Sequence, residues 1–127
     1  MYLLFLIGRI LFGGYFIYNA FNHFTHVKGM SGYAATKSVP MPSVAIIFSG
    51  LLLLFGGVSV VLGVAPFIGL LCLIVFLIPV TFTMHSFWTD TDAGARMGNQ
   101  INFYKNMALL GAVLICFVIP RPWPHSL

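Results

Sequence analysis

The sequence predicts an all-α integral membrane protein: one domain, residues 1–127, folded as a four-helix bundle. Of the 127 residues, 60% are hydrophobic and only 6% are charged. A soluble domain carries about 25% charged residues, so lipid must be the solvent for much of this chain. Four apolar stretches each have roughly the 20 residues that a bilayer requires. They cover about 2–24, 43–63, 66–88 and 101–119.

The first stretch concentrates polar residues where lipid makes them costly. The helix carries Arg9, Asn19 and His23, and His26 follows just beyond its predicted end. At 100° per residue, these side chains share one side of the helix with Gly13 and Ala20, opposite Ile7, Gly14, Tyr18 and Phe21. The polar side is therefore predicted to face other helices or a cavity.

Arg9 is the most expensive residue of this helix, at about 2.5–3.5 kcal/mol near a helix centre on insertion scales. No acidic residue of the chain is expected to reach it within the membrane. Its side chain either snorkels toward the nearer interface or is held against helix carbonyls or a partner's carboxylate. A structural role and a subunit-contact role both remain open.

Residues 27–42 are predicted to form an interfacial segment between the first two helices. Tyr33 suits the headgroup zone, and Lys37 is expected to snorkel there. A brief helix capped by Ser31 fits the sequence.

The second stretch has no charge and repeats small residues at helical spacing. Such positions allow another backbone to approach closely. Together with Arg9, the predicted subunit or packing contacts are Gly50, Gly56, Gly57 and Gly63. Val64 and Ala65 then turn the chain, and Pro66 begins the third helix, which makes the second and third helices antiparallel neighbours.

Antiparallel helices bring the polar side chains of three spans to one end of the bundle. The ligand or headgroup candidates at this end are His23, His26, His85, Asn102, Lys105 and Asn106. These side chains fit either a hydrogen-bond network that holds the helices together at this end or a pocket for the headgroup of a quinone or lipid. A metal or tetrapyrrole on histidine is a weaker alternative, because no intramembrane cysteine or carboxylate completes a site. No metal ligand is assigned.

Several function classes find no support in the sequence. The Lys and Arg residues are scattered, whereas nucleic-acid binding needs clustered cations. No nucleophile–base pair, phosphate loop or dinucleotide fingerprint appears, so no catalytic residue is assigned. No motif for a cofactor of the chain's own is present, although a quinone fits the polar end. The isolated chain is expected to have no activity.

Charge asymmetry predicts the orientation of the bundle. Lys28, Lys37, Arg96 and Lys105 flank the two longer loops, and only Arg121 flanks the end that carries both termini. Loops rich in Lys and Arg stay in the cytoplasm. The loops are therefore predicted to be cytoplasmic and the termini outside.

Four runs resemble the DoxX family of small bacterial membrane proteins. They are NAFNHFTHVKGMSGYAATKSVPMP, SGLLLLFGGVSVVLGVAPFIG, FLIPVTFTMHSFW and INFYKNMALLGA. The resemblance implies a four-helix bundle in the bacterial inner membrane, and some members are described as membrane subunits of a thiosulfate:quinone oxidoreductase or of redox assemblies. Many members carry a Glu shortly before the double glycine, where this sequence has Leu53.

The resemblance and the residues together predict an accessory subunit or assembly factor of a larger membrane complex, one that transfers electrons. The alternative is a quinone-interacting subunit of an oxidoreductase. The expected partners are membrane lipids, a larger membrane protein complex and, in the alternative, a quinone. The missing Glu favours the accessory role, because Leu53 can neither relay a proton nor bind a quinol hydroxyl.

Overall fold

The computed structural model describes residues 2–127. Its elements are α1 (Tyr2–Thr25), α2 (Val27–Thr36), α3 (Pro42–Leu62), α4 (Pro66–Thr83), the 3-10 turn η1 (Phe87–Thr89) and α5 (Ala93–Phe117). The described residues contain no strand, and four helices are long and apolar enough to cross a membrane. The predicted fold class is confirmed.

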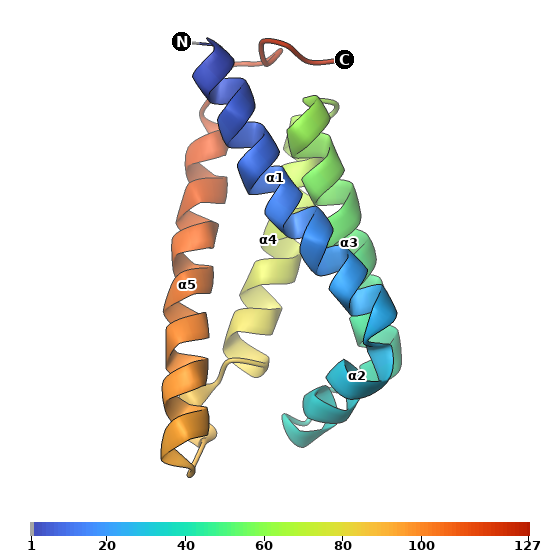
Figure 1. The fold of residues 1–127 in the computed structure, drawn as a ribbon, viewed down its shortest axis with the longest axis vertical. Helices are drawn as coiled ribbons and strands as arrows, with labels where there is room; N and C mark the ends of the chain where they lie inside the picture. The colour runs from blue at the N-terminus through green and yellow to red at the C-terminus, as the bar shows by residue number, and fades with distance from the viewer. Residues whose placement is uncertain (1) are drawn as a thin grey trace.

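The long helices pack in the order α1, α3, α4, α5 (Figure 1). The short helix α2 packs on α3 at the end opposite to the two termini. The helices α1 and α5 do not close the ring, because no Cα atom of α1 lies within 8 Å of a Cα atom of α5. We call the end with α2 the loop end and the other the terminal end.

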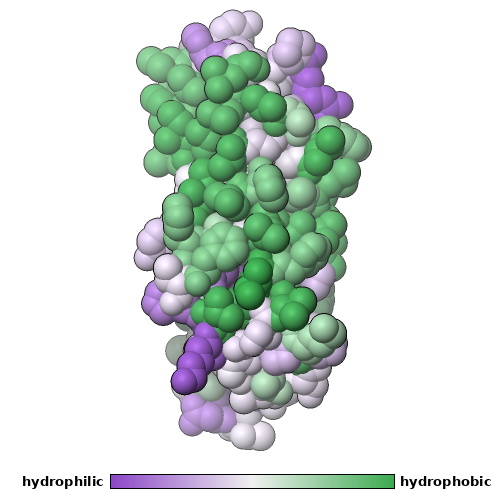
Figure 2. Space-filling model, turned by 90° about the vertical axis from the view of Figure 1, so that its right-hand side faces the viewer, coloured by the Kyte–Doolittle hydropathy of each residue, from purple (hydrophilic) through white to green (hydrophobic). Residues whose placement is uncertain are grey.

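The predicted inner face of α1 is confirmed. The buried residues of this helix recur every three or four positions: Arg9, Gly13, Phe16, Ala20 and His23. Ile7, Tyr18 and Phe21 are exposed on the opposite side. Figure 2 shows apolar side chains over most of one face, with hydrophilic residues toward the two ends, as expected for a protein surrounded by lipid.

The glycines of α3 allow two helices to approach it closely. A Cβ added to Gly57 would lie 2.7 Å from the carbonyl oxygen of Gly13 in α1. A Cβ added to Gly56 would lie 2.6 Å from Leu73 Cδ2 in α4, and one at Gly50 would lie 2.8 Å from Phe24 Cε1 in α1. These glycine contacts are therefore made within the chain, and α1 and α4 occupy the surfaces on which a foreign helix would pack.

A tight turn makes α3 and α4 antiparallel neighbours, as predicted. Gly63 ends α3 in the left-handed conformation with φ of 72°, where glycine is the least strained residue. Ser59 Oγ donates to the carbonyl oxygen of Val64 at 2.6 Å. Pro66 is at the start of α4.

Three boundaries differ from the predicted ones. The helix α5 begins at Ala93 rather than at residue 101, because Asp92 Oδ2 caps it by accepting from the Ala95 N–H at 2.8 Å. The helix α2 begins at Val27, directly after α1, so Ser31 lies inside it. The helix α4 ends at Thr83 and η1 completes the third span.

The core includes one residue from the C-terminal tail. Trp123 is 2% exposed and packs with the buried side chains of the helices. Its ring meets Phe5 edge to face, with centroids 5.4 Å apart. The prolines of this segment indicate only where the last helix ends, and no sequence pattern predicts that Trp123 is buried.

Candidate functional site

A cavity of about 480 Å³ lies inside the loop-end half of the bundle. All five α-helices contribute to its walls. Pockets of 300–1,000 Å³ are typical of small-molecule sites, which combine apolar walls with a few placed polar groups. The apolar wall includes Phe16, Ile46, Leu53, Phe76 and Leu77.

Five of the six predicted ligand candidates line this cavity. They are His23, His85, Asn102, Lys105 and Asn106. His26 does not, because it follows the end of α1 on an exposed surface, where its Nδ1 lies 2.9 Å from Thr25 Oγ1. His26 therefore lies apart from the cavity that the other five candidates line.

His23 presents an imidazole nitrogen without a protein partner. Its Nδ1 lies 2.8 Å from the Asn19 carbonyl oxygen, which can only accept, so Nδ1 carries the proton. In the neutral ring, Nε2 is then an acceptor, and within residues 2–127 it has no hydrogen-bond partner. The side chain is only 5% exposed and belongs to the cavity wall.

Asn106 is a second polar group of the cavity wall without a protein partner. The residue is 6% exposed, and its amide makes no hydrogen bond to any part of the chain that the structure describes. Among residues 2–127, the fully buried side-chain N or O atom without a partner is Trp123 Nε1, so the Asn106 amide and His23 Nε2 are open to the cavity. An amide offers two donors and an acceptor, so Asn106 can bind either a carbonyl or a hydroxyl in the cavity.

The orientation of His85 is fixed by Asn99. The Asn99 amide nitrogen donates to Asp90 Oδ2 at 2.7 Å and to the Tyr33 hydroxyl at 2.8 Å. Its oxygen therefore faces His85 Nδ1, 3.3 Å away, so this nitrogen is the donor of the ring. The other nitrogen, Nε2, is left as an acceptor, as in His23.

Lys105 lies near the middle of α5 rather than at its start, because this helix begins at Ala93. Twelve residues separate it from Ala93, a rise of about 18 Å along the helix axis. Its Nζ lies 5.7 Å from the centroid of the Tyr15 ring in α1. The cavity wall of the described chain includes no Asp or Glu, and Leu53, 0% exposed, is part of it. Lys105 thus has no carboxylate counter-charge there.

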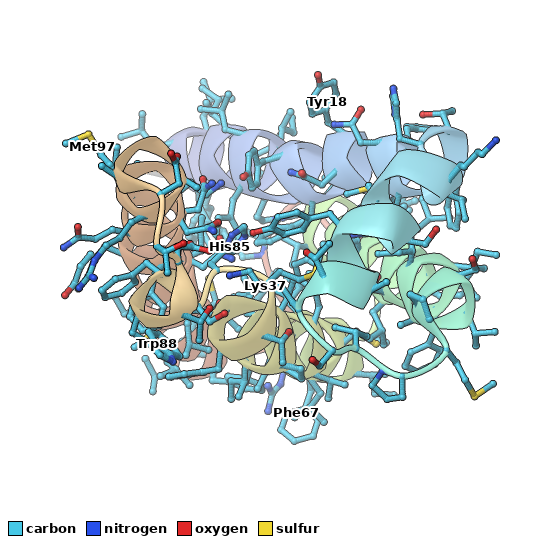
Figure 3. The ribbon with its side chains drawn as sticks, turned by 90° about the horizontal axis from the view of Figure 1, so that it is seen from below. Tyr18, Lys37, Phe67, His85, Trp88 and Met97 are labelled. Carbon is cyan, nitrogen blue, oxygen red and sulfur yellow. The ribbon has the colours of Figure 1, made fainter. Side chains whose placement is uncertain are left out.

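A polar cluster closes the loop end beneath His85. We call Tyr33, Lys37, Asp90 and Asn99 the loop-end latch. Lys37 Nζ lies 2.8 Å from Asp90 Oδ1, and the Tyr33 hydroxyl donates to the Met84 carbonyl oxygen at 2.9 Å. Viewed from below, Lys37 and His85 both lie among the helices near the centre of the bundle (Figure 3).

The latch joins α2 to η1 and α5, and sequence reasoning missed it. Lys37 was expected to snorkel, but its side chain is only 9% exposed and is paired with Asp90. The partners are 53 residues apart. No local pattern marks such a pair.

The latch should weaken in acid. The Asn99 hydrogen bond and the Lys37 ammonium hold the pKa of Asp90 below its usual value. Because the ionised Asp90 carboxylate is favoured in the folded chain, it stabilises the fold at pH values above its pKa in the unfolded chain, about 3.9. This stability is lost as the pH falls through the pKa of Asp90 in the folded chain. We expect the melting temperature in detergent to fall below about pH 4, and to fall less in Asp90→Asn. Asp92→Asn, which keeps the capping oxygen, is the control and should behave like the unmodified chain.

Arg9 forms a separate buried contact at the terminal end. Its side chain is 3% exposed. Its Nε donates to the Val60 carbonyl oxygen at 3.1 Å and its Nη2 to that of Val61 at 2.8 Å, both in α3. The carbonyl oxygens of Pro124 and His125 in the tail accept from Nη1 and Nη2. Of the roles left open for Arg9, the geometry places the guanidinium against backbone carbonyls, without snorkelling to the interface.

The four apolar helices define the class as a small multi-pass membrane protein. The chain belongs to the DoxX family, whose model, described as DoxX, matches residues 4–86. The match covers α1 to α4 and includes His23 and His85, whereas α5, with Lys105 and Asn106, lies beyond it. Comparisons with curated proteins and with solved structures gave no match.

Proposed function

We propose that this chain is a membrane subunit of an electron-transfer complex and that its cavity binds the headgroup of a quinone. The observation that carries the proposal is the pair of polar groups without a protein partner, His23 Nε2 and the Asn106 amide, that face the interior of a mostly apolar cavity. A quinone has an apolar tail and two carbonyl oxygens, which become hydroxyls on reduction. The tail matches the apolar walls of the cavity, and the two oxygens match its polar side chains.

The cavity offers hydrogen-bond donors for the quinone and hydrogen-bond acceptors for the quinol. A quinone carbonyl would accept from the Asn106 amide or from Lys105. A quinol hydroxyl would donate to Nε2 of His23 or His85, since each ring keeps its proton on Nδ1. The chain would therefore bind and orient the headgroup and offer imidazole nitrogens to its protons.

The accessory character follows from the absence of any redox motif in the sequence. Electron transfer needs a cofactor, which a protein can only bind and tune. A partner subunit would supply it. The family resemblance supports this arrangement, since some members are described as subunits of quinone-reducing assemblies.

Quinone binding can be measured on the purified protein in lipid nanodiscs by titration with ubiquinone or menaquinone. We expect saturable binding, and a Kd raised roughly 3- to 18-fold in Asn106→Leu and in His23→Leu, from about 0.6–1.7 kcal/mol per membrane hydrogen bond. His26→Leu is the matched control, because this histidine lies off the cavity, and it should leave Kd unchanged. Absence of saturable binding, or equal weakening by all three variants, would contradict the proposal.

We also propose the inner membrane as the location, with the loop end in the cytoplasm. Lys28, Lys37 and Arg96 lie toward the loop end. Among the Lys and Arg residues of the described chain, Arg121 is the one exposed at the terminal end. Thr91→Cys, in a chain whose native cysteines are changed to Ala, should resist an impermeant thiol reagent in intact cells and react after permeabilisation. Val64→Cys, in the turn at the terminal end, should react in intact cells. The reverse pattern would invert the orientation.

A further inference from the structure

The cavity extends to the place where α1 and α5 fail to pack. We call this place the seam and define it by Tyr15 of α1 and by Lys105 and Leu109 of α5, all of which line the cavity. Figure 1 shows α5 diverging from α1 toward the loop end. The cavity therefore meets the lipid-facing side of the bundle through side chains alone, without a helix–helix contact.

A cation–π contact crosses the seam. The Lys105 ammonium lies 5.7 Å from the centroid of the Tyr15 ring. Tyr15 is 36% exposed, and Lys105 is exposed as well. A cation–π contact shielded from water is strong enough to hold the two side chains together but weak enough for them to separate and return as they change rotamer. Both partners have long, rotatable side chains on rigid helices.

Of the other sides of the cavity, the loop end is held firmly and the α3–α4 side is held only toward the terminal end. The loop-end latch joins α2, η1 and α5 through an ion pair and several hydrogen bonds. The helices α3 and α4 are linked by a tight turn and packed at Gly56 against Leu73. Phe48, Val75 and Pro79 line the cavity where these two helices separate near the loop end, which makes that side the competing route.

We propose that the quinone enters the cavity sideways from the bilayer through the seam, and that the Lys105–Tyr15 contact is the gate. This inference rests on the proposed function. The headgroup passes between the two side chains and reaches His23 and Asn106, while the tail stays in the seam. The ammonium faces no carboxylate in the described part of the cavity wall, so the electron-rich carbonyl oxygens of an entering headgroup meet an unpaired donor at the entrance.

A crosslink across the seam tests the route. The chain would carry Tyr15→Cys and Leu109→Cys with Cys72 and Cys116 changed to Ala, and a bismaleimide would join the new thiols, because the helices are too far apart for a disulfide. The protein is loaded with quinone first, and release into excess vesicles is then followed with and without the crosslinker. We expect release to slow at least tenfold.

The matched control joins α3 to α4 through Phe48→Cys and Val75→Cys and should leave the release rate unchanged. The proposed route through the seam would be wrong if the control crosslink slows release and the seam crosslink does not. It would also be wrong if both crosslinks slow release equally. Saturable binding to the uncrosslinked protein is recorded separately, so that a chain that binds no quinone contradicts the proposed function instead.

Substitution at Tyr15 gives an independent measurement. Tyr15→Leu removes the aromatic face, whereas Tyr15→Phe keeps it, and both leave His23 and Asn106 unchanged. We expect Tyr15→Leu to raise the association and dissociation rates of quinone together by about threefold or more, with a smaller change in Kd, and Tyr15→Phe to match the parent chain. Equal rates in all three proteins would overturn the gate.

Discussion

Arg9→Leu is expected to lower the free energy of unfolding by about 2–4 kcal/mol. The guanidinium donates to four carbonyl oxygens from two segments, and a membrane hydrogen bond contributes about 0.6 kcal/mol on average and up to about 1.7. Leucine fills much of the volume but leaves those carbonyls without a donor. The loss should be visible as a lower midpoint of unfolding in mixed detergent micelles.

Two variants separate the geometry of the Arg9 contact from its charge. Arg9→Lys keeps the charge but not the planar fork, so an intermediate loss is expected. Arg121→Leu removes an exposed arginine from the same end, whose guanidinium lies 5.4 Å from the centroid of the Phe67 ring. It should cost less than about 1 kcal/mol. Equal losses in Arg9→Leu and Arg121→Leu would contradict the buried contact.

Gly13→Ala should destabilise the contact between α1 and α3 by about 1–3 kcal/mol, the usual cost of overpacking. The new Cβ would lie 2.6 Å from the Gly57 carbonyl oxygen and 2.7 Å from Val61 Cγ2, and the first of these atoms is backbone. Relief requires the two helices to move apart. The same melting experiment reports the loss.

The neighbouring glycine is the control for this substitution. Nothing lies within 4 Å of a Cβ added to Gly14, so Gly14→Ala should be neutral or stabilise the chain by up to about 1 kcal/mol through its higher helix propensity. The two variants add the same methyl group to adjacent positions of one helix. Similar effects from both would show that α1 does not pack on α3 through Gly13.

The fold could be predicted because its signals are local. Hydropathy locates the spans, and the side of α1 that carries Arg9, Gly13 and His23 is recognisable from helical spacing alone. The polar end of the bundle follows from antiparallel topology, which brings His23 of α1, His85 of the turn after α4 and Asn106 of α5 to one cavity.

The remaining features depend on pairings that no local pattern reveals. Lys37 and Asp90 meet across 53 residues, and Trp123 reaches the core from a proline-rich tail. The failure of α1 and α5 to pack depends on how helices separated by the whole chain cross one another. His26 has the spacing of a ligand but lies just past the end of its helix, on the outside.

The contact between Arg9 and the tail also dictates an order of events during synthesis. Pro124 is 115 residues downstream of Arg9, so at 5–20 residues per second about 6–23 s pass before the ribosome adds it. In that interval α1 is already in or near the membrane, and its guanidinium can use only the α3 carbonyls or lipid headgroups. The terminal end of the bundle is therefore the last part to mature, and a nascent chain stalled before residue 124 would retain an incompletely satisfied charge in the bilayer.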